Sequence, residues 1–128
     1  MKLTSGTITV PVERDGQPVG ELCFDPGDVA FAERFYRMTQ GLTQREQQLR
    51  QQQDTPLGER LTQLTETVHW LRAQLDEIFG EGSSVMLFGE QCSLTLFQQF
   101  FEGIEPVIRR ARDKKTARYR GVGGDVMA

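Results

Sequence analysis

Few side chains in this sequence have the types and spacing that chemistry requires. His69 is the single histidine, and Glu66 precedes it by three residues, where one turn of a helix brings two side chains together. General acid–base catalysis also needs a reacting nucleophile within reach of the imidazole. We therefore interpret His69 as a surface or packing residue.

The remaining candidates for chemistry are equally weak. One histidine with Cys23 and Cys92, which are far apart in the sequence, does not give the ligand spacing of a zinc site, and we expect a reduced cysteine pair. The glycines at 80–89 lack the Lys-Ser/Thr ending and the preceding strand of a phosphate-binding loop. The carboxylate pairs Asp76/Glu77 and Glu102/Glu105 are expected on solvated helix faces. The sequence thus predicts no catalytic residue, no cofactor site and no metal site, and hence no enzyme.

The elements around these residues are easier to recognise. Residues 79–89, Phe-Gly-Glu-Gly-Ser-Ser-Val-Met-Leu-Phe-Gly, interrupt two amphipathic stretches. Gly80 ends the apolar periodicity of one helix, Ser83 or Ser84 can cap a short helical turn, and Gly89 can end that turn. Because this junction is apolar, it must pack against the fold or against a partner.

A β-hairpin is predicted at the N-terminus. Residues 6–13 alternate and are rich in β-branched side chains, and Asp15-Gly16 separates them from a second run at 18–24. Pro11 places its strand at a sheet edge. The hairpin needs a helix over its apolar face, which is either the face with Ile8, Val10, Leu22 and Phe24 or the opposite one.

Two long helices follow. Asp25 or Asp28 can cap the first, whose polar run at 44–53 extends beyond the core and stops before Pro56. The second has an apolar seam with strict spacings of four and three, which implies a neighbouring helix. The antiparallel first helix is one choice and a second copy of the protein is the other. The seam residues are Leu57, Leu61, Leu64, Val68, Leu71, Leu75 and Ile78.

The last helix is predicted to begin at Ser93 and to bend or break near 102–106, because a proline inside a helix costs about 3 kcal/mol. The expected fold is α+β: a hairpin packed on a bundle of three main helices, with a short helical turn between the second and third. Residues 1–24 form the hairpin, 25–120 the bundle and 121–128 a flexible tail, all in a single domain.

Charge is distributed unevenly over the 128 residues, whose net charge is −3. Residues 1–108 hold eight basic and sixteen acidic side chains, whereas residues 109–128 hold seven basic and two acidic ones. No apolar run reaches the roughly 18 residues of a membrane helix, and no signal peptide is recognisable. We expect a protein of the cytoplasm without a membrane partner.

Three segments together carry a family resemblance. They are "FDPGDVAFAERFYRM" (24–38), the FGEG(S/T)-x4-FG junction, and "LFQQFFEGIEPVIRRAR" (96–112). Over residues 22–121 the chain resembles small proteins encoded among the tail genes of siphophages and prophages of Gram-positive bacteria, several of them tail-assembly-chaperone-like. The resemblance implies a binding protein in the bacterial host cytoplasm that holds a long helical partner, the tape-measure protein, during virion tail assembly.

Partner binding would use apolar helix faces, and an oligomer is compatible with the long seam. The candidate contact residues are Leu71, Phe88, Phe97 and Phe101. The alternatives are a subunit that stays in the finished tail and a small regulatory or nucleic-acid-associated protein, whose basic end could neutralise phosphates. A solvated helix end explains the same charges, so nucleic acid is the less favoured partner. Its candidate residues are Arg109, Arg110, Arg112, Lys114, Lys115 and Arg118.

Overall fold

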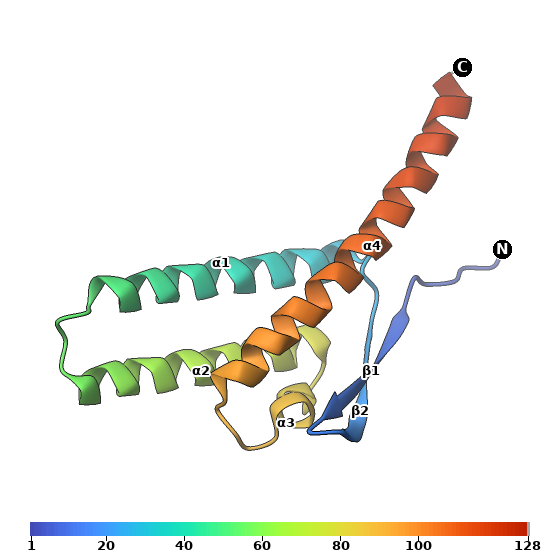
Figure 1. Ribbon diagram of the computed structural model, residues 1–128. Coiled ribbons are helices and arrows are strands. Elements are labelled where there is room, and N and C mark those ends of the chain that lie inside the picture. Colours follow the sequence, from blue (N-terminus) through green and yellow to red (C-terminus); the bar gives the residue numbers. More distant parts are fainter. Residues whose placement is uncertain (128) are drawn as a thin grey trace.

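A computed structural model describes the backbone of residues 1–127 and the side chains of residues 1–111 and 113. It has the predicted α+β architecture, an N-terminal antiparallel hairpin followed by helices, three of them long (Figure 1). The elements are β1 (Ile8–Arg14), β2 (Gln17–Phe24), α1 (Val29–Gln51), α2 (Leu57–Phe79), α3 (Ser83–Phe88) and α4 (Leu94–Met127).

The hairpin forms at the predicted turn. Asp15 and Gly16 have φ angles of 54° and 77°, as a two-residue turn with the twist of the flanking strands requires. Pairing of Val10 with Leu22 resolves the choice of face: Leu22 and Phe24 are buried, whereas Thr9 and Cys23 are exposed. The register shifts between Val12 and Glu13, and the adjacent Gly20 of β2 lies against the side chain of Met86 in α3.

Helices α1 and α2 pack against each other and run antiparallel (Figure 1). Of the two neighbours predicted for the α2 seam, this is the first helix of the same chain. The side chain of Asp28 caps α1 by accepting a hydrogen bond from the Ala30 N–H at 2.9 Å. No residue between Met38 and Thr67 is buried, so the far ends of both helices project from the core. We call residues 43–66 the arm.

Trp70 of α2 packs against α1 at the base of the arm. Its indole lies so close to the α1 backbone that a Cβ at Gly41 would be 2.7 Å from the ring. The guanidinium of Arg45 stacks over the same ring at 4.3 Å from the centroid. The glycine that weakens α1 by helix propensity thus permits a close approach of the two helices.

The short helix α3 is held at both ends by side chains from other elements. The expected serine cap is wrong: Gly82 is the N-cap residue, and the carboxylate of Asp76 accepts hydrogen bonds from the Ser84 N–H at 2.8 Å and hydroxyl at 3.2 Å. Asp76 was expected on a solvated face, but the chain reversal at Gly80 brings α3 back against it. At the other end, Arg14 donates to the Met86 carbonyl at 2.7 Å and Arg72 to the Gly89 carbonyl at 2.6 Å. Negative charge at a helix N-terminus and positive charge at its C-terminus both stabilise α3.

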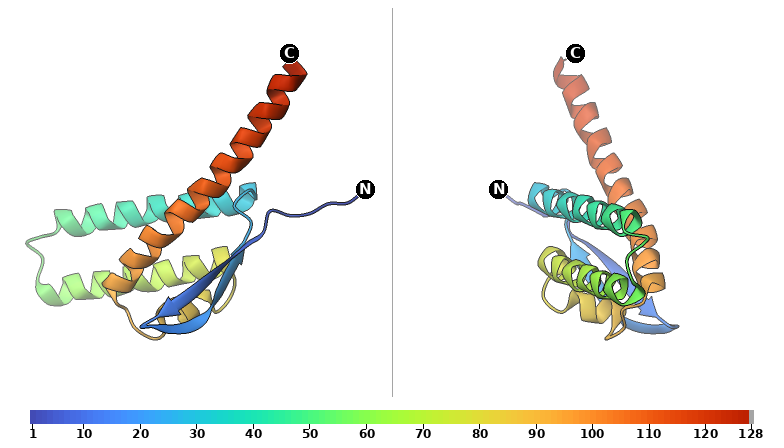
Figure 2. Two further views of the ribbon diagram at one scale, coloured as in Figure 1. Left: turned by 45° about the vertical axis from the view of Figure 1, so that its right-hand side comes forward. Right: turned by 90° about the vertical axis from the view of Figure 1, so that its left-hand side faces the viewer.

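Helix α4 begins at Leu94, one residue after the predicted start, and continues to Met127. Of the bend or break predicted near 102–106, the break into two helices is wrong, because Pro106 lies inside one continuous helix. A bend at this proline stays a prediction. Glu102, whose carbonyl loses its donor at the proline, is exposed, so water can replace that hydrogen bond. The helical region also extends past the predicted boundary at residue 120, and its C-terminal half projects beyond the body (Figure 2).

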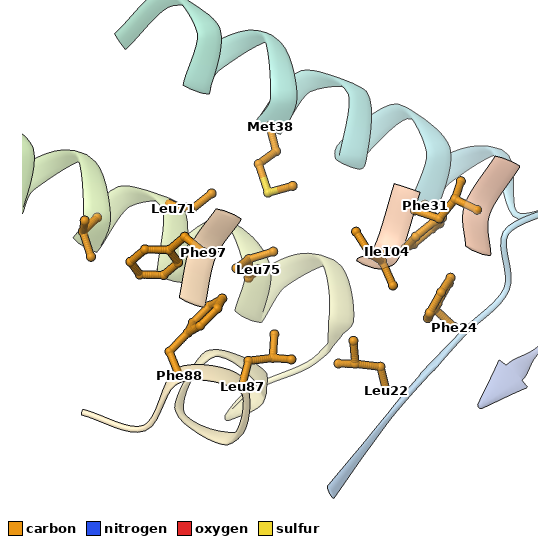
Figure 3. Packing of buried hydrophobic residues seen from close by; sticks show 12 residues of the cluster. Leu22, Phe24, Phe31, Met38, Leu71, Leu75, Leu87, Phe88, Phe97 and Ile104 are labelled. Carbon is orange, nitrogen blue, oxygen red and sulfur yellow. The ribbon is translucent and has the colours of Figure 1, made fainter. Parts of the chain in front are cut away.

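The core lies where the hairpin, α3 and α4 meet the near halves of α1 and α2, and Figure 3 shows its buried side chains. All eight phenylalanines belong to one connected series of ring contacts, with centroids between 4.3 and 6.5 Å apart. Phe79, at the end of α2, contacts four other rings and joins the hairpin, α1 and α4. Those rings are Phe24, Phe31, Phe35 and Phe100.

Candidate functional site: an apolar groove between three helices

The residues considered for chemistry are not brought together. His69 and Glu66 are exposed on α2, and both cysteines are free and exposed. In the described part of the chain, no three histidine, cysteine, aspartate or glutamate side chains gather as metal ligands do. Every buried polar side-chain atom in that part has a hydrogen-bond partner. Apolar surface is therefore the feature that remains to be explained.

A large groove lies between α1, α2 and α4, where α4 crosses the other two helices. Its volume is about 750 Å³. We call it the helix groove. Each wall is one stripe along a helix. The lining residues are Thr39, Leu42, Thr43, Glu46, Leu49 and Arg50 from α1; Leu64, Thr67, Val68 and Leu71 from α2; and Leu94, Phe97, Gln98, Phe101, Glu102 and Glu105 from α4.

Spacings of three and four within each wall give the helix groove its shape. Side chains so spaced form a ridge along one helix face, and ridges of one helix fit between those of the next. Stripes of this kind on three helices suit the apolar face of a further α-helix, which is a common occupant of such grooves.

The apolar stripe of α2 continues past the helix groove into the arm. Leu57 and Leu61 share the face of Leu64 by spacing, but they are 70% and 53% exposed. On the opposite wall, Leu94 is 53% exposed at the start of α4. The predicted seam thus has a covered half at Val68, Leu71 and Leu75 and an open half in the arm.

Three of the four predicted contact residues line the helix groove. Leu71 and Phe97 form its floor and are only 3% and 5% exposed, whereas Phe101 is half-buried in its wall. Phe88 lies beneath, 1% exposed, with its ring 4.3 Å from that of Phe97. A partner in the helix groove could contact Phe101 directly and Leu71 and Phe97 at the floor, and it would meet Phe88 only if the core opened.

The candidate basic residues are placed on α4 beyond the helix groove. Arg109 and Arg110 are exposed, and Arg109 lies near Glu105 and Asp113. The side chains of Arg112, Lys114, Lys115 and Arg118 lie outside the described residues. The backbone that carries them is helical.

Sequence reasoning missed the α1 wall. Leu42 and Leu49 are apolar positions of α1, but nothing in their spacing tells which neighbour covers them. Glu46 and Arg50 were counted within a polar run. Their place in the helix groove depends on the direction in which α4 leaves the body, which is a property of the packed structure.

Comparison with known proteins places the chain in a family. Residues 20–122 match a family of unknown function, DUF6673. The chain belongs to this family. The DUF6673 match begins within β2 and includes all three walls of the helix groove, and β1 lies before it. No curated protein and no solved structure matches the chain.

In the described part of this DUF6673 protein, no helix is both long enough and apolar enough to cross a bilayer.

Proposed function

We propose that this DUF6673 protein is a binding protein that holds a helical segment of another protein in the helix groove. The observation that carries the proposal is the set of three helical walls, each with its own stripe, around a channel that the chain leaves open. Binding of an amphipathic helix in an apolar groove is a common mode of protein recognition. It requires no chemistry from the site.

The resemblance to tail-assembly-chaperone-like proteins suggests which partner to test. We propose the tape-measure protein, a long helical protein, in the cytoplasm of a bacterial host during virion tail assembly. The open stripe at Leu57, Leu61 and Leu64 supports a long occupant, because it extends the apolar contact from the helix groove along the arm. Burial of such stripes would keep the partner from aggregating before it is assembled.

Co-expression with the tape-measure protein of the same genome, followed by affinity purification and light scattering, tests this function. We expect a complex of defined mass that keeps the partner soluble. The variant Leu94→Asp should lose most of the partner, because the charge would face the apolar helix groove. An aspartate in the first turn of α4 is compatible with folding.

Val85→Asp is the matched control. Val85 is 55% exposed, against 53% for Leu94, but it lies on α3 and does not line the helix groove. Equal capture by wild type and Leu94→Asp would exclude the groove as the binding surface. Absence of any complex, together with a stable free oligomer, would instead favour a subunit of the finished tail.

A second candidate function rests on the basic end of α4. Arg109 and Arg110 are exposed on α4, whose C-terminal half projects beyond the body (Figure 2), and a projecting basic helix is suited to phosphate contacts. In this case DNA affinity would fall steeply with salt and would disappear on deletion of residues 109–128. DNA binding unchanged by that deletion would exclude this candidate.

A further inference from the structure

We infer that the helix groove selects an amphipathic helix whose apolar stripe is flanked by lysine or arginine. The inference rests on the proposed function and adds the chemistry of the partner. It follows from the polar groups at the rim, which fall into two kinds.

The first kind is hydroxyl groups that are already satisfied. Thr39, Thr43 and Thr67 line the helix groove, and each donates its hydroxyl to a carbonyl of its own helix, at 2.8, 3.0 and 2.9 Å. Because these hydroxyls have partners, the threonines present mainly their methyl groups to an occupant. These methyl groups add apolar contact, and the occupant need not accept a hydrogen bond from the threonine hydroxyls.

The second kind is charged groups. Glu46 on α1 and Glu102 and Glu105 on α4 face the helix groove with Arg50 as the single cation among its lining residues. All three glutamates are exposed, and the one ion pair among the described residues joins Arg37 to Glu33 instead. The lining residues therefore carry net negative charge, which comes from the α4 wall, whereas Glu46 shares the α1 wall with Arg50.

The three carboxylates near the helix crossing discriminate between partner helices by charge. A helix in the groove presents its flanking side chains to α1 on one side and to α4 on the other. Lysine or arginine at those positions meets Glu46 on one flank and Glu102 and Glu105 on the other, whereas a glutamate would be repelled from both. Their long apolar stems also extend the contact with the groove walls.

Arg50 makes the charge of the helix groove differ between its two ends, which favours one orientation of a bound helix. It lies one turn beyond Glu46, nearer the tip of the arm, so the carboxylates concentrate where α4 crosses and the cation stands at the open end. A bound helix would thus place its basic flanks near the crossing and could place a carboxylate near the arm.

Two synthetic peptides test the inference with the full chain. Each is about three heptads long with leucines at spacings of three and four, and the flanking positions are all lysine in one and all glutamate in the other. Fluorescence anisotropy of labelled peptide gives the affinity. We expect the lysine peptide to bind at least about tenfold more tightly, with a preference that weakens as salt is raised.

A charge-matched pair of variants locates the effect. Glu46→Gln, Glu102→Gln and Glu105→Gln combined should weaken lysine-peptide binding about three- to tenfold, as expected for three exposed ion pairs. The control combines Glu21→Gln, Glu81→Gln and Glu90→Gln, which change net charge equally at exposed sites outside the groove. It should leave the affinity unchanged.

The outcomes separate this inference from the proposed function. Equal binding of both peptides, or equal effects of the two triple variants, would overturn the charge selection and leave helix binding intact. Binding of neither peptide would overturn both. Light scattering of the free protein tests a second copy as the occupant: a monomer supports the inference. An oligomer that must dissociate before the peptide binds would assign the groove to another copy and overturn it.

Discussion

The contact between Gly41 and Trp70 predicts that Gly41→Ala destabilises the wild-type protein but stabilises the Trp70→Ala variant. Alanine at an exposed helix position is more favourable than glycine by about 1 kcal/mol, so helix propensity alone makes Gly41→Ala stabilising. The structure opposes this gain, because the new Cβ would lie 2.7 and 2.8 Å from the Cη2 and Cζ2 atoms of Trp70. Carbon atoms cannot approach so closely, and either the indole or α1 must move.

The cost of that movement exceeds the gain. Overpacking costs about 1–3 kcal/mol, and displacement of the indole also weakens its contact with Arg45, which contributes roughly 0.5–1 kcal/mol. Gly41→Ala should therefore lower the free energy of unfolding by about 1–2 kcal/mol, after its propensity gain of about 1 kcal/mol is included. With Trp70→Ala as background, the obstruction is absent and the same change should stabilise the protein by about 1 kcal/mol.

Urea unfolding of the wild type, both single variants and the double variant measures these values as a double-mutant cycle. Circular dichroism is the suitable probe, since Trp70 is the only tryptophan and its removal abolishes the intrinsic tryptophan signal. We expect a coupling free energy of about 2–3 kcal/mol between the two positions. If Gly41→Ala stabilises the wild type as much as it stabilises the Trp70→Ala variant, the close helix approach is wrong.

Three further predictions concern stability and are measured in the same way. Phe79→Ala should lower the free energy of unfolding by about 3 kcal/mol, the low end for a phenylalanine in a core, because Phe79 is half-buried and contacts four rings. A smaller loss than that of the peripheral Phe101→Ala would contradict its central position. Asp76→Ala should lower the free energy of unfolding by about 1 kcal/mol, because it removes the side-chain cap of α3. Glu77→Ala, at the neighbouring exposed position, should lower it much less. Equal losses would contradict the capping role of Asp76. Pro106→Ala should stabilise α4 by about 1–3 kcal/mol, because it restores a backbone donor for the Glu102 carbonyl; an unchanged or lower stability would show that the proline ring contributes packing of similar value.

The helix groove links these local tests to function. Gly41 and Trp70 set the distance between α1 and α2 beside Leu42, so the expected shift in Gly41→Ala would also alter the spacing of two groove walls. Partner capture by that variant should therefore fall even where the protein remains folded. Val85→Asp, which lies outside the groove, is the appropriate comparison.

The sequence alone determined the features that depend on local backbone conformation. Asp15-Gly16 specifies a two-residue hairpin turn because few other residues adopt positive φ at both positions. The spacing of Leu57 to Ile78 specifies a helix with one apolar face. Gly80 and Gly89, with φ angles of 112° and 62°, end helices at the places where the periodicity stops.

Only the tertiary structure decided which of these surfaces are covered. Leu61 and Leu75 occupy equivalent places in the α2 stripe, yet one is 53% exposed and the other fully buried. Leu75 lies in the core half of α2, where α3 and β2 also pack on this helix, whereas Leu61 lies in the arm. Asp76 similarly acquires its role from a chain reversal that brings Ser84 against it. A helical pattern records which side chains share a face, whereas the neighbour of that face is set by contacts between residues far apart in the chain.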